Sequence, residues 1–172
     1  KRIFRNKPTF RIGSVDLDGQ DDYQTKKEKF ARIILDQMYH FAGLLDGEGN
    51  ILEINVPALR GAGLSMEDVV GTPFWEARWF ALSEESRAAQ REMVLRAAQG
   101  EFIRRDIEVY GEASGERTII TDYSLTPLRD ESGEVRFILA EGRNITEKKK
   151  VEVEVARKKN ELEELLRKNR EL

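Results

Sequence analysis

Hydrophobic positions recur with a helical period near the start of the chain. Within residues 30–38 the apolar side chains lie three to four positions apart, and this spacing predicts one apolar stripe along a helix. Thr25 and Glu28 have the spacing of a capping box at its beginning. We therefore expect a flanking helix over residues 25–40. Residues 1–24 show no sustained period, so a polar N-terminal arm is expected there.

The period then changes to two, which is typical of strands. The apolar stretches 41–45 and 51–55 flank a run of turn-forming residues and predict a β-hairpin. Alternating stretches at 103–109, 118–128 and 135–140 predict three further strands. Five strands are therefore expected, two before and three after a helical middle section.

Glycine and proline residues divide that middle section into short pieces. Repeated Gly and Pro over residues 56–80 allow only short helical turns. Ser83 has the character of an N-cap and Gly100 that of a terminator, which predicts a longer helix over 84–99. Its expected inner face consists of Ala89, Met93, Val94 and Ala97.

Four large aromatic rings lie close together in the stretch VVGTPFWEARWF, residues 69–80. They are Phe74, Trp75, Trp79 and Phe80, and they include both tryptophans of the chain. Rings of this size are usually buried, so one interpretation is a hydrophobic plug. The other is one wall of an apolar ligand pocket, formed by a loop that lies over a sheet.

The composition changes again after residue 145, where charged residues dominate. Asn144 can cap a helix there, and seven positions follow the 4-3-4-3 spacing of a coiled coil. We call these seven positions the heptad stripe: Val151, Val155, Lys158, Leu162, Leu165, Asn169 and Leu172. The stripe predicts a parallel dimeric coiled coil, and a long charged single helix is the alternative.

Charge and residue content exclude several classes of function. The chain has 172 residues, a formal net charge of −3 and no cysteine. These features argue against a nucleic-acid partner, a disulfide or a cysteine nucleophile, and favour a cytoplasmic protein. No apolar run reaches a membrane-spanning length, so no membrane partner is expected. No catalytic or metal-binding set can be assembled, and the start at Lys1 indicates a fragment.

The order of expected elements resembles a PAS domain, whose five-stranded antiparallel sheet carries helices over one face. The segment AEGRNITEKK at residues 140–149 resembles the family's junction between its last strand and its signalling helix. The resemblance implies an α+β PAS fold, with the sensor domain at 41–144 and a coiled-coil signalling helix at 145–172. It assigns signal relay to Asn144, Ile145 and Thr146, although the family usually has Asp where Asn144 stands.

Four longer blocks narrow this resemblance. ARIILDQMYHFAGLLD, GTPFWEARWF, GEFIRRDIEV and LAEGRNITEKKK are similar to the first PAS domain of toluene-responsive sensor histidine kinases of the TodS and TutC type. The resemblance implies an apolar pocket that holds one aromatic ring. The positions that match its lining are Phe41, Val69, Phe74 and Val109, and further candidates are Trp79, Ile54 and Thr121. Val69 and Val109 stand where the related domain has isoleucine, which would enlarge the pocket slightly.

The resemblance thus implies the non-enzymatic input module of a two-component histidine kinase. Its expected ligand is toluene or a similar monoaromatic hydrocarbon, without a cofactor, and its expected partner is a second copy bound through the N-terminal and C-terminal helices. Two alternatives remain: a ligand-free dimerisation module, and a redox sensor with flavin or heme. Heme sensors of this family usually present a histidine from the long helix, whereas the only histidine here is His40.

Overall fold

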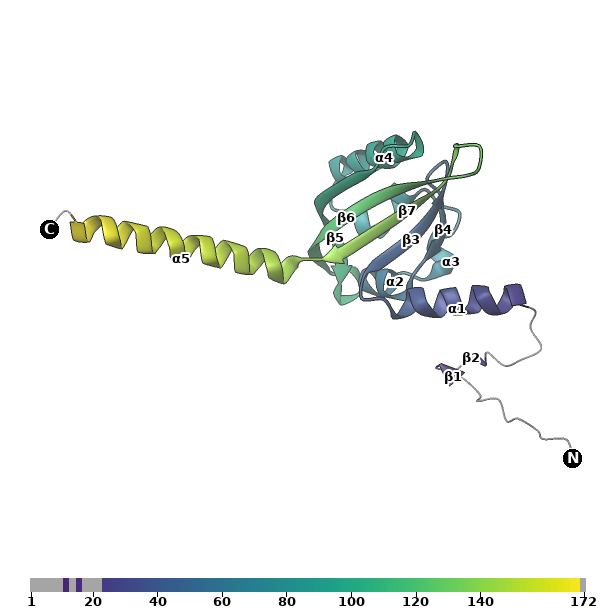
Figure 1. The fold of residues 1–172 in the computed structure, drawn as a ribbon, viewed down its shortest axis with the longest axis horizontal. Coiled ribbons are helices and arrows are strands. Elements are labelled where there is room, and N and C mark those ends of the chain that lie inside the picture. Colours follow the sequence, from purple (N-terminus) through teal and green to yellow (C-terminus); the bar gives the residue numbers. More distant parts are fainter. Residues whose placement is uncertain (1–10, 13–14, 17–22, 171–172) are drawn as a thin grey trace, which may run out of the picture.

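The computed structural model describes residues 11–12, 15–16 and 23–170 (Figure 1). Within the expected N-terminal arm, two short strands pair antiparallel, β1 (Arg11–Ile12) and β2 (Val15–Asp16). The rest of the arm, and Leu172 at the end of the heptad stripe, lie outside the described residues.

A sheet of five antiparallel strands forms the centre of the fold, in the order β4-β3-β7-β6-β5. The strands are β3 (Phe41–Asp46), β4 (Ile51–Ile54), β5 (Ile103–Glu112), β6 (Arg117–Arg129) and β7 (Val135–Asn144). The expected sheet is therefore confirmed. The last strand is longer than the sequence indicated, because its pairing with β6 continues through Gly142 to Asn144.

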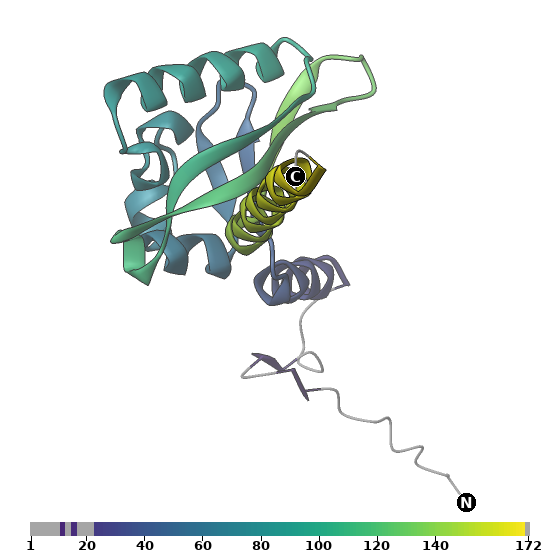
Figure 2. The ribbon, with the colours of Figure 1, turned by 90° about the vertical axis from the view of Figure 1, so that its left-hand side faces the viewer.

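Short helices cover one face of this sheet, as the glycines and prolines of that region predicted (Figures 1 and 2). They are α2 (Val56–Ala62), α3 (Met66–Val69), and the 3-10 helices η1 (Phe74–Glu76) and η2 (Arg78–Phe80). The longer helix α4 (Glu84–Ala98) follows, with the Ser83 side chain accepting from the Ser86 N–H at 3.0 Å. The predicted cap is therefore confirmed.

The inner face of α4 differs from the prediction at one position. Met93, Val94 and Ala97 are buried as expected, but Ala89 is exposed and Gln90 takes the inner position. Burial of this amide is possible because Gln90 Nε2 donates a hydrogen bond to the Tyr123 hydroxyl. A polar residue with a specific partner thus occupies a place that an apolar pattern cannot reveal.

Helix α1 (Tyr23–Gln37) lies beside the β3–β4 end of the sheet (Figure 1). It begins before Thr25, so the predicted capping box is wrong. Arg32 forms an ion pair with Glu53 of β4, and Asp36 Oδ1 accepts from the Val56 N–H at 3.0 Å. These contacts fix the C-terminal half of α1 to the domain.

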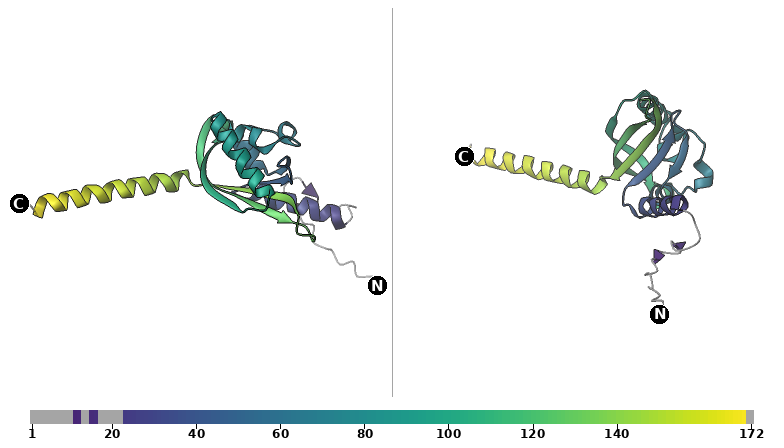
Figure 3. Two further views of the ribbon diagram at one scale, coloured as in Figure 1. Left: turned by 90° about the horizontal axis from the view of Figure 1, so that it is seen from above. Right: turned by 45° about the vertical axis from the view of Figure 1, so that its right-hand side comes forward.

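The last helix, α5 (Thr146–Arg170), projects from the domain as a rod (Figures 1 and 3). None of its described residues is buried, and Val155, Leu162 and Leu165 of the heptad stripe are 58%, 57% and 60% exposed. The helix itself is confirmed, whereas the coiled coil stays a prediction. Across the part of the chain that the structure describes, no helix is both long and apolar enough to cross a bilayer.

Candidate functional site

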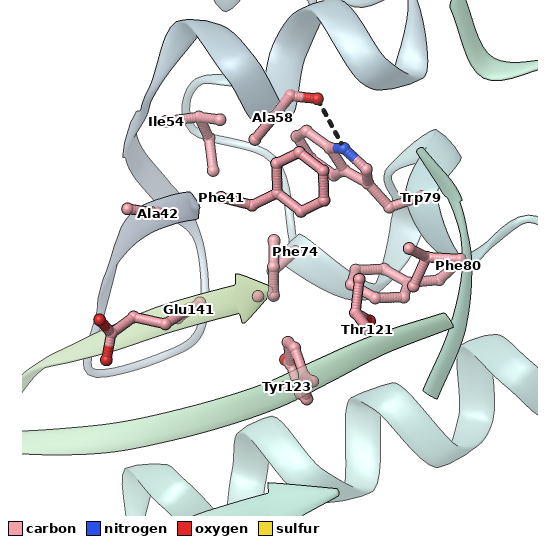
Figure 4. A pocket seen from close by; sticks show the side chains of 14 residues that line it. Phe41, Ala42, Ile54, Ala58, Phe74, Trp79, Phe80, Thr121, Tyr123 and Glu141 are labelled. Atoms are coloured by element: carbon pink, nitrogen blue, oxygen red, sulfur yellow. Dashed lines mark hydrogen bonds between the residues drawn. The ribbon is translucent and has the colours of Figure 1, made fainter. Parts of the chain in front are cut away.

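A cavity lies between the inner face of the sheet and the helical cover (Figure 4). The empty space inside it and at its opening is about 420 Å³, part of which is open to solvent. Fourteen residues line it: Phe41, Ala42, Gly43, Ile54, Ala58, Phe74, Trp79, Phe80, Val109, Thr121, Tyr123, Ala140, Glu141 and Gly142. All but three of these are apolar residues, counting glycine with them, so the surface is suited to an apolar ligand.

Six of the seven ligand-binding residues expected from the sequence line this cavity. Val69 is the exception: it is buried in the same core, 3% exposed, but does not line the cavity. Val69 ends α3, where its carbonyl accepts hydrogen bonds from the backbone N–H and the hydroxyl of Thr72, at 3.0 and 2.7 Å. Its position is therefore fixed by the turn that leads out of α3.

The aromatic segment is core on one side and cavity wall on the other. The Phe74 ring contacts Phe80 edge-on at 5.0 Å between centroids and Trp79 at 5.9 Å. Phe80 continues the cluster to Tyr123 at 6.5 Å. Trp75 is not part of the lining; its ring lies under the Arg91 guanidinium at 5.9 Å. The two interpretations of this segment, plug and wall, are thus combined in one cluster of rings.

The polar side-chain atoms of the buried lining residues already have partners. Trp79 Nε1 donates to the Ala58 carbonyl at 3.0 Å, as Figure 4 shows. Thr121 Oγ1 donates to the Ile107 carbonyl at 3.1 Å, and the Tyr123 hydroxyl accepts from Gln90. No buried side-chain nitrogen or oxygen in the described part of the chain lacks a partner. A ligand in this cavity therefore gains burial and shape contacts rather than new hydrogen bonds.

Charge is also absent from the interior of the cavity. Burial raises the pKa of the Tyr123 phenol far above its usual range, so this residue is neutral at ordinary pH. The carboxylate of Glu141 points away from the aromatic rings (Figure 4). His40 is exposed and lines an outer groove with Phe102 and Arg104 instead. Among the residues that the structure describes, no group of three or more His, Cys, Asp or Glu could hold a metal ion.

Asn55 supports the cavity from behind, a role that the sequence interpretation missed. It is 2% exposed, and its Oδ1 accepts from the Ala42 N–H at 3.0 Å and the Ala58 N–H at 3.4 Å. Its Nδ2 donates to the carbonyls of Leu35 and His40. One amide thus joins α1, β3 and α2. An Asn two residues before a proline is a helix-cap signal that could have identified it.

Two glycines lie beside the side chains of the cavity wall, and the sequence analysis did not identify them as lining residues. A Cβ at Gly142 would lie 3.4 Å from Phe41 Cδ2 and 3.8 Å from Thr121 Cγ2. A Cβ at Gly43 would lie 2.5 Å from Ile54 Cδ1, closer than atoms can approach. The absence of a side chain at Gly43 therefore lets Ile54 take its place in the wall, whereas a Cβ at Gly142 would make only ordinary van der Waals contacts.

The expected relay residues lie next to the cavity wall. Asn144 is paired with Thr121 across the β6–β7 ladder, and the Ile145 N–H donates to the Ile120 carbonyl at 2.8 Å. The Ile120 N–H donates to Thr146 Oγ1 at 3.0 Å. Asn144 Oδ1 accepts from the N–H and the hydroxyl of Thr146, at 3.0 and 2.7 Å. The amide oxygen thus supplies an acceptor at the position where the family usually has an acid.

Comparison with known proteins places these observations in context. The chain is 47% identical over all 172 residues to "Sensor histidine kinase TmoS" of Ectopseudomonas mendocina. It is 49% identical over 148 residues, 86% of the chain, to "Hybrid signal transduction histidine kinase D" of Dictyostelium discoideum. The match spans only 18% and 10% of the length of these two relatives.

Solved structures and a family model agree with the fold described above. The PAS domain of Bordetella pertussis BvgS superposes with a TM-score of 0.57 at 26% identity, covering 80% of this chain and 97% of that domain. The model of the PAS fold family matches residues 35–150, which is more than half of the chain. The chain therefore belongs to the PAS fold family.

Proposed function

We propose that this chain is the sensory input module of a two-component histidine kinase and that it binds a small apolar aromatic hydrocarbon, such as toluene, in the cavity. The observation that carries the proposal is that the polar side-chain atoms of the buried lining residues already have hydrogen-bond partners within the protein. Those of Trp79, Thr121 and Tyr123 are all used by protein partners. A ligand without hydrogen-bonding groups therefore loses nothing on entry.

Burial alone sets the affinity that such a ligand can reach. Toluene has seven heavy atoms, and a very efficient small ligand gains at most about 1.5 kcal/mol per heavy atom. The ceiling is thus about 10 kcal/mol, which corresponds to a dissociation constant of tens of nanomolar, and micromolar binding lies within this ceiling.

The relatives support the kinase context of this proposal. Both carry the words histidine kinase in their names, and the chain matches a minor part of each. The four sequence blocks that resemble toluene-responsive kinases include much of the wall, with Phe41, Phe74 and Val109 among their residues. The phosphotransfer reaction belongs to the proposed whole protein rather than to the part described above.

Transmission of the signal follows from a shift between two packings of the domain. A ligand that binds one packing of sheet and cover more tightly raises the population of that packing. The wall residue Thr121 is paired with Asn144, so a change in β6 reaches the beginning of α5 directly. We propose that α5 then changes its pairing with the same helix of a second copy, in a homodimer that also uses the exposed Phe30 and Ile34 of α1.

A ligand-free dimerisation module is the second candidate. The exposed heptad stripe supports this candidate as much as it supports the ligand-binding module. Calorimetric titration with toluene, with benzyl alcohol as matched control, separates the two. We expect micromolar binding of toluene and at least tenfold weaker binding of benzyl alcohol, because its hydroxyl would be buried without a partner. No binding heat and no thermal stabilisation with saturating toluene would leave only the dimerisation module.

A further inference from the structure

The ion pairs of α5 differ in what they connect. Lys149 Nζ lies 2.7 Å from Asp106 Oδ2 on β5. The other ion pairs of this helix, as far as the structure describes it, join residues within α5 itself. Lys149 therefore makes the ion pair that joins the helix to the sheet.

The charges around Asp106 explain why a cation is stabilised there. Asp106 stands directly opposite Asp122 in the β5–β6 ladder, and like charges at such a position repel each other. Arg104 neutralises Asp122 through two hydrogen bonds of 2.9 and 2.6 Å. Asp106 forms its ion pair with Lys149. Lys149 Nζ also lies 3.8 Å from Glu152 Oε2 of its own helix. Departure of the helix would thus remove the cation that pairs with Asp106, which faces another carboxylate in the ladder.

Asp106 is also close in sequence to the cavity wall. The next residue, Ile107, accepts the hydrogen bond of Thr121 through its carbonyl, and Val109 lines the cavity two residues later. The same strand therefore carries the wall on its inner face and the anion for Lys149 on its outer face. On the neighbouring strand, the Ile120 carbonyl accepts from the Ile145 N–H, and the Ile120 N–H donates to the Thr146 hydroxyl oxygen.

We propose that the Lys149–Asp106 ion pair holds the first turn of α5 against the sheet and is the charged anchor of the junction between β7 and α5. Asn144 keeps the hydrogen bonds of this junction but contributes no charge. The consequence for signalling rests on the proposed function, since it assumes that ligand binding moves β5. The anchoring itself does not depend on a ligand.

Amide hydrogen exchange of Ile145 and Ile120, measured by NMR on the full chain, tests the proposal. In Asp106→Asn and in Lys149→Gln we expect exchange at both amides to become about two- to fivefold faster, the effect of losing one exposed ion pair. The matched control is Lys150→Gln, which removes the same charge from the same turn but only a pair with Glu147 at 2.9 Å. Exchange in the control should equal that of the unmodified chain.

The exchanged pair Asp106→Lys with Lys149→Asp separates a specific anchor from general charge effects. It should restore the exchange rates to within about twofold of the unmodified chain. Rates that do not change in either single variant, or an exchanged pair as fast as the single variants, would overturn the proposal. Toluene affinity, measured in parallel, should be the same in all variants, so failure of the anchor and failure of the ligand proposal give different results.

Discussion

Thr121 and Asn144 face each other across the β6–β7 ladder, so a residue of the cavity wall is paired with the last residue of β7, two residues before α5 begins. Hydrogen bonds of the adjacent residue Ile120 with Ile145 and Thr146 tie the beginning of α5 to β6. The cavity wall and the beginning of α5 are thus separated by one strand pair. The cavity, the junction between β7 and α5, and helix α5 itself can be tested separately because each depends on different residues.

The cavity wall is tested by one substitution at two positions. Val109→Ile adds a methylene that points into the cavity, whereas Val69→Ile adds it elsewhere in the same core. We expect Val109→Ile to weaken binding of the larger monoaromatics by about 1–3 kcal/mol, the effect of one methylene in an apolar pocket. Val69→Ile should leave every affinity within about twofold. Calorimetry with benzene, toluene and xylene checks both, and equal effects at the two positions would contradict the assigned lining.

The tryptophans offer a second matched comparison. Trp79→Phe removes the hydrogen bond to the Ala58 carbonyl and replaces a buried indole with a smaller ring. The expected loss of unfolding free energy is about 1–3 kcal/mol, measured by urea denaturation. Trp75→Phe makes the same change at a half-buried ring that contacts Arg91, and it should cost less than about 1 kcal/mol. An equal cost at both positions would show that the Trp79 hydrogen bond contributes little.

The buried phenol of Tyr123 predicts a characteristic pH dependence of stability. Burial raises the pKa of Tyr123 in the folded chain, whereas in the unfolded chain it titrates near 10. The unfolded chain therefore releases this proton first, so the contribution of Tyr123 is fully present below pH 10 and is lost as the pH rises above it. Urea denaturation from pH 8 to 11 should show this decline, and it should be shallower in Tyr123→Phe. Parallel profiles of the two proteins would contradict the assignment.

The junction between β7 and α5 can be altered at Thr146 without changing a residue of the cavity wall. Thr146→Val removes the oxygen that accepts from the Ile120 N–H, whereas Thr146→Ser keeps it. Toluene affinity should stay within about twofold in both variants. Because the chain has no cysteine, nitroxide labels at Glu116→Cys and Arg167→Cys report the distance between the sheet and α5. We expect toluene to change this distance in Thr146→Ser but not in Thr146→Val, and an equal response in both would contradict the relay.

The heptad stripe makes a prediction about assembly. Val155 lies on the stripe and Val153 lies off it, although both are more than half exposed in one copy, at 58% and 69%. Val155→Lys should therefore shift a dimer to monomer by placing a charge in the helix interface. Val153→Lys should leave the dimer intact. Analytical ultracentrifugation at tens of micromolar protein distinguishes monomer from dimer in each variant. A monomeric unmodified chain would contradict the coiled coil.

Strong local signals explain why the fold could be predicted from the sequence. The alternation at residues 103–109 and the cap signal at Ser83 are both local, and both are confirmed by the structure. Gln90 and Asn55 could not be placed in the same way, because each is buried for the sake of a partner distant in sequence. Burial of a polar group depends on such tertiary partners rather than on periodicity.

The candidate site was predictable only in part, for a related reason. Phe41, Phe74 and Val109 could be placed through the family resemblance, and the structure brings them to one cavity. Val69 could not be separated from them, because a buried valine at the end of a short helix looks the same in sequence whether or not it faces a cavity. The contribution of Gly43 depends on the close approach of Ile54 Cδ1 across the β3–β4 pair, which the sequence does not show.

Intermolecular NMR contacts between toluene and the methyl groups of the chain test the central claim most directly. If an unpolar ring completes this partly empty interior, its protons should show nuclear Overhauser contacts to the methyls of Ile54, Val109 and Thr121, which line the cavity from three different strands. The methyls of Val69 and of Val153 on α5 should show none. Contacts confined to exposed methyls, or no contacts at saturating toluene, would contradict the account.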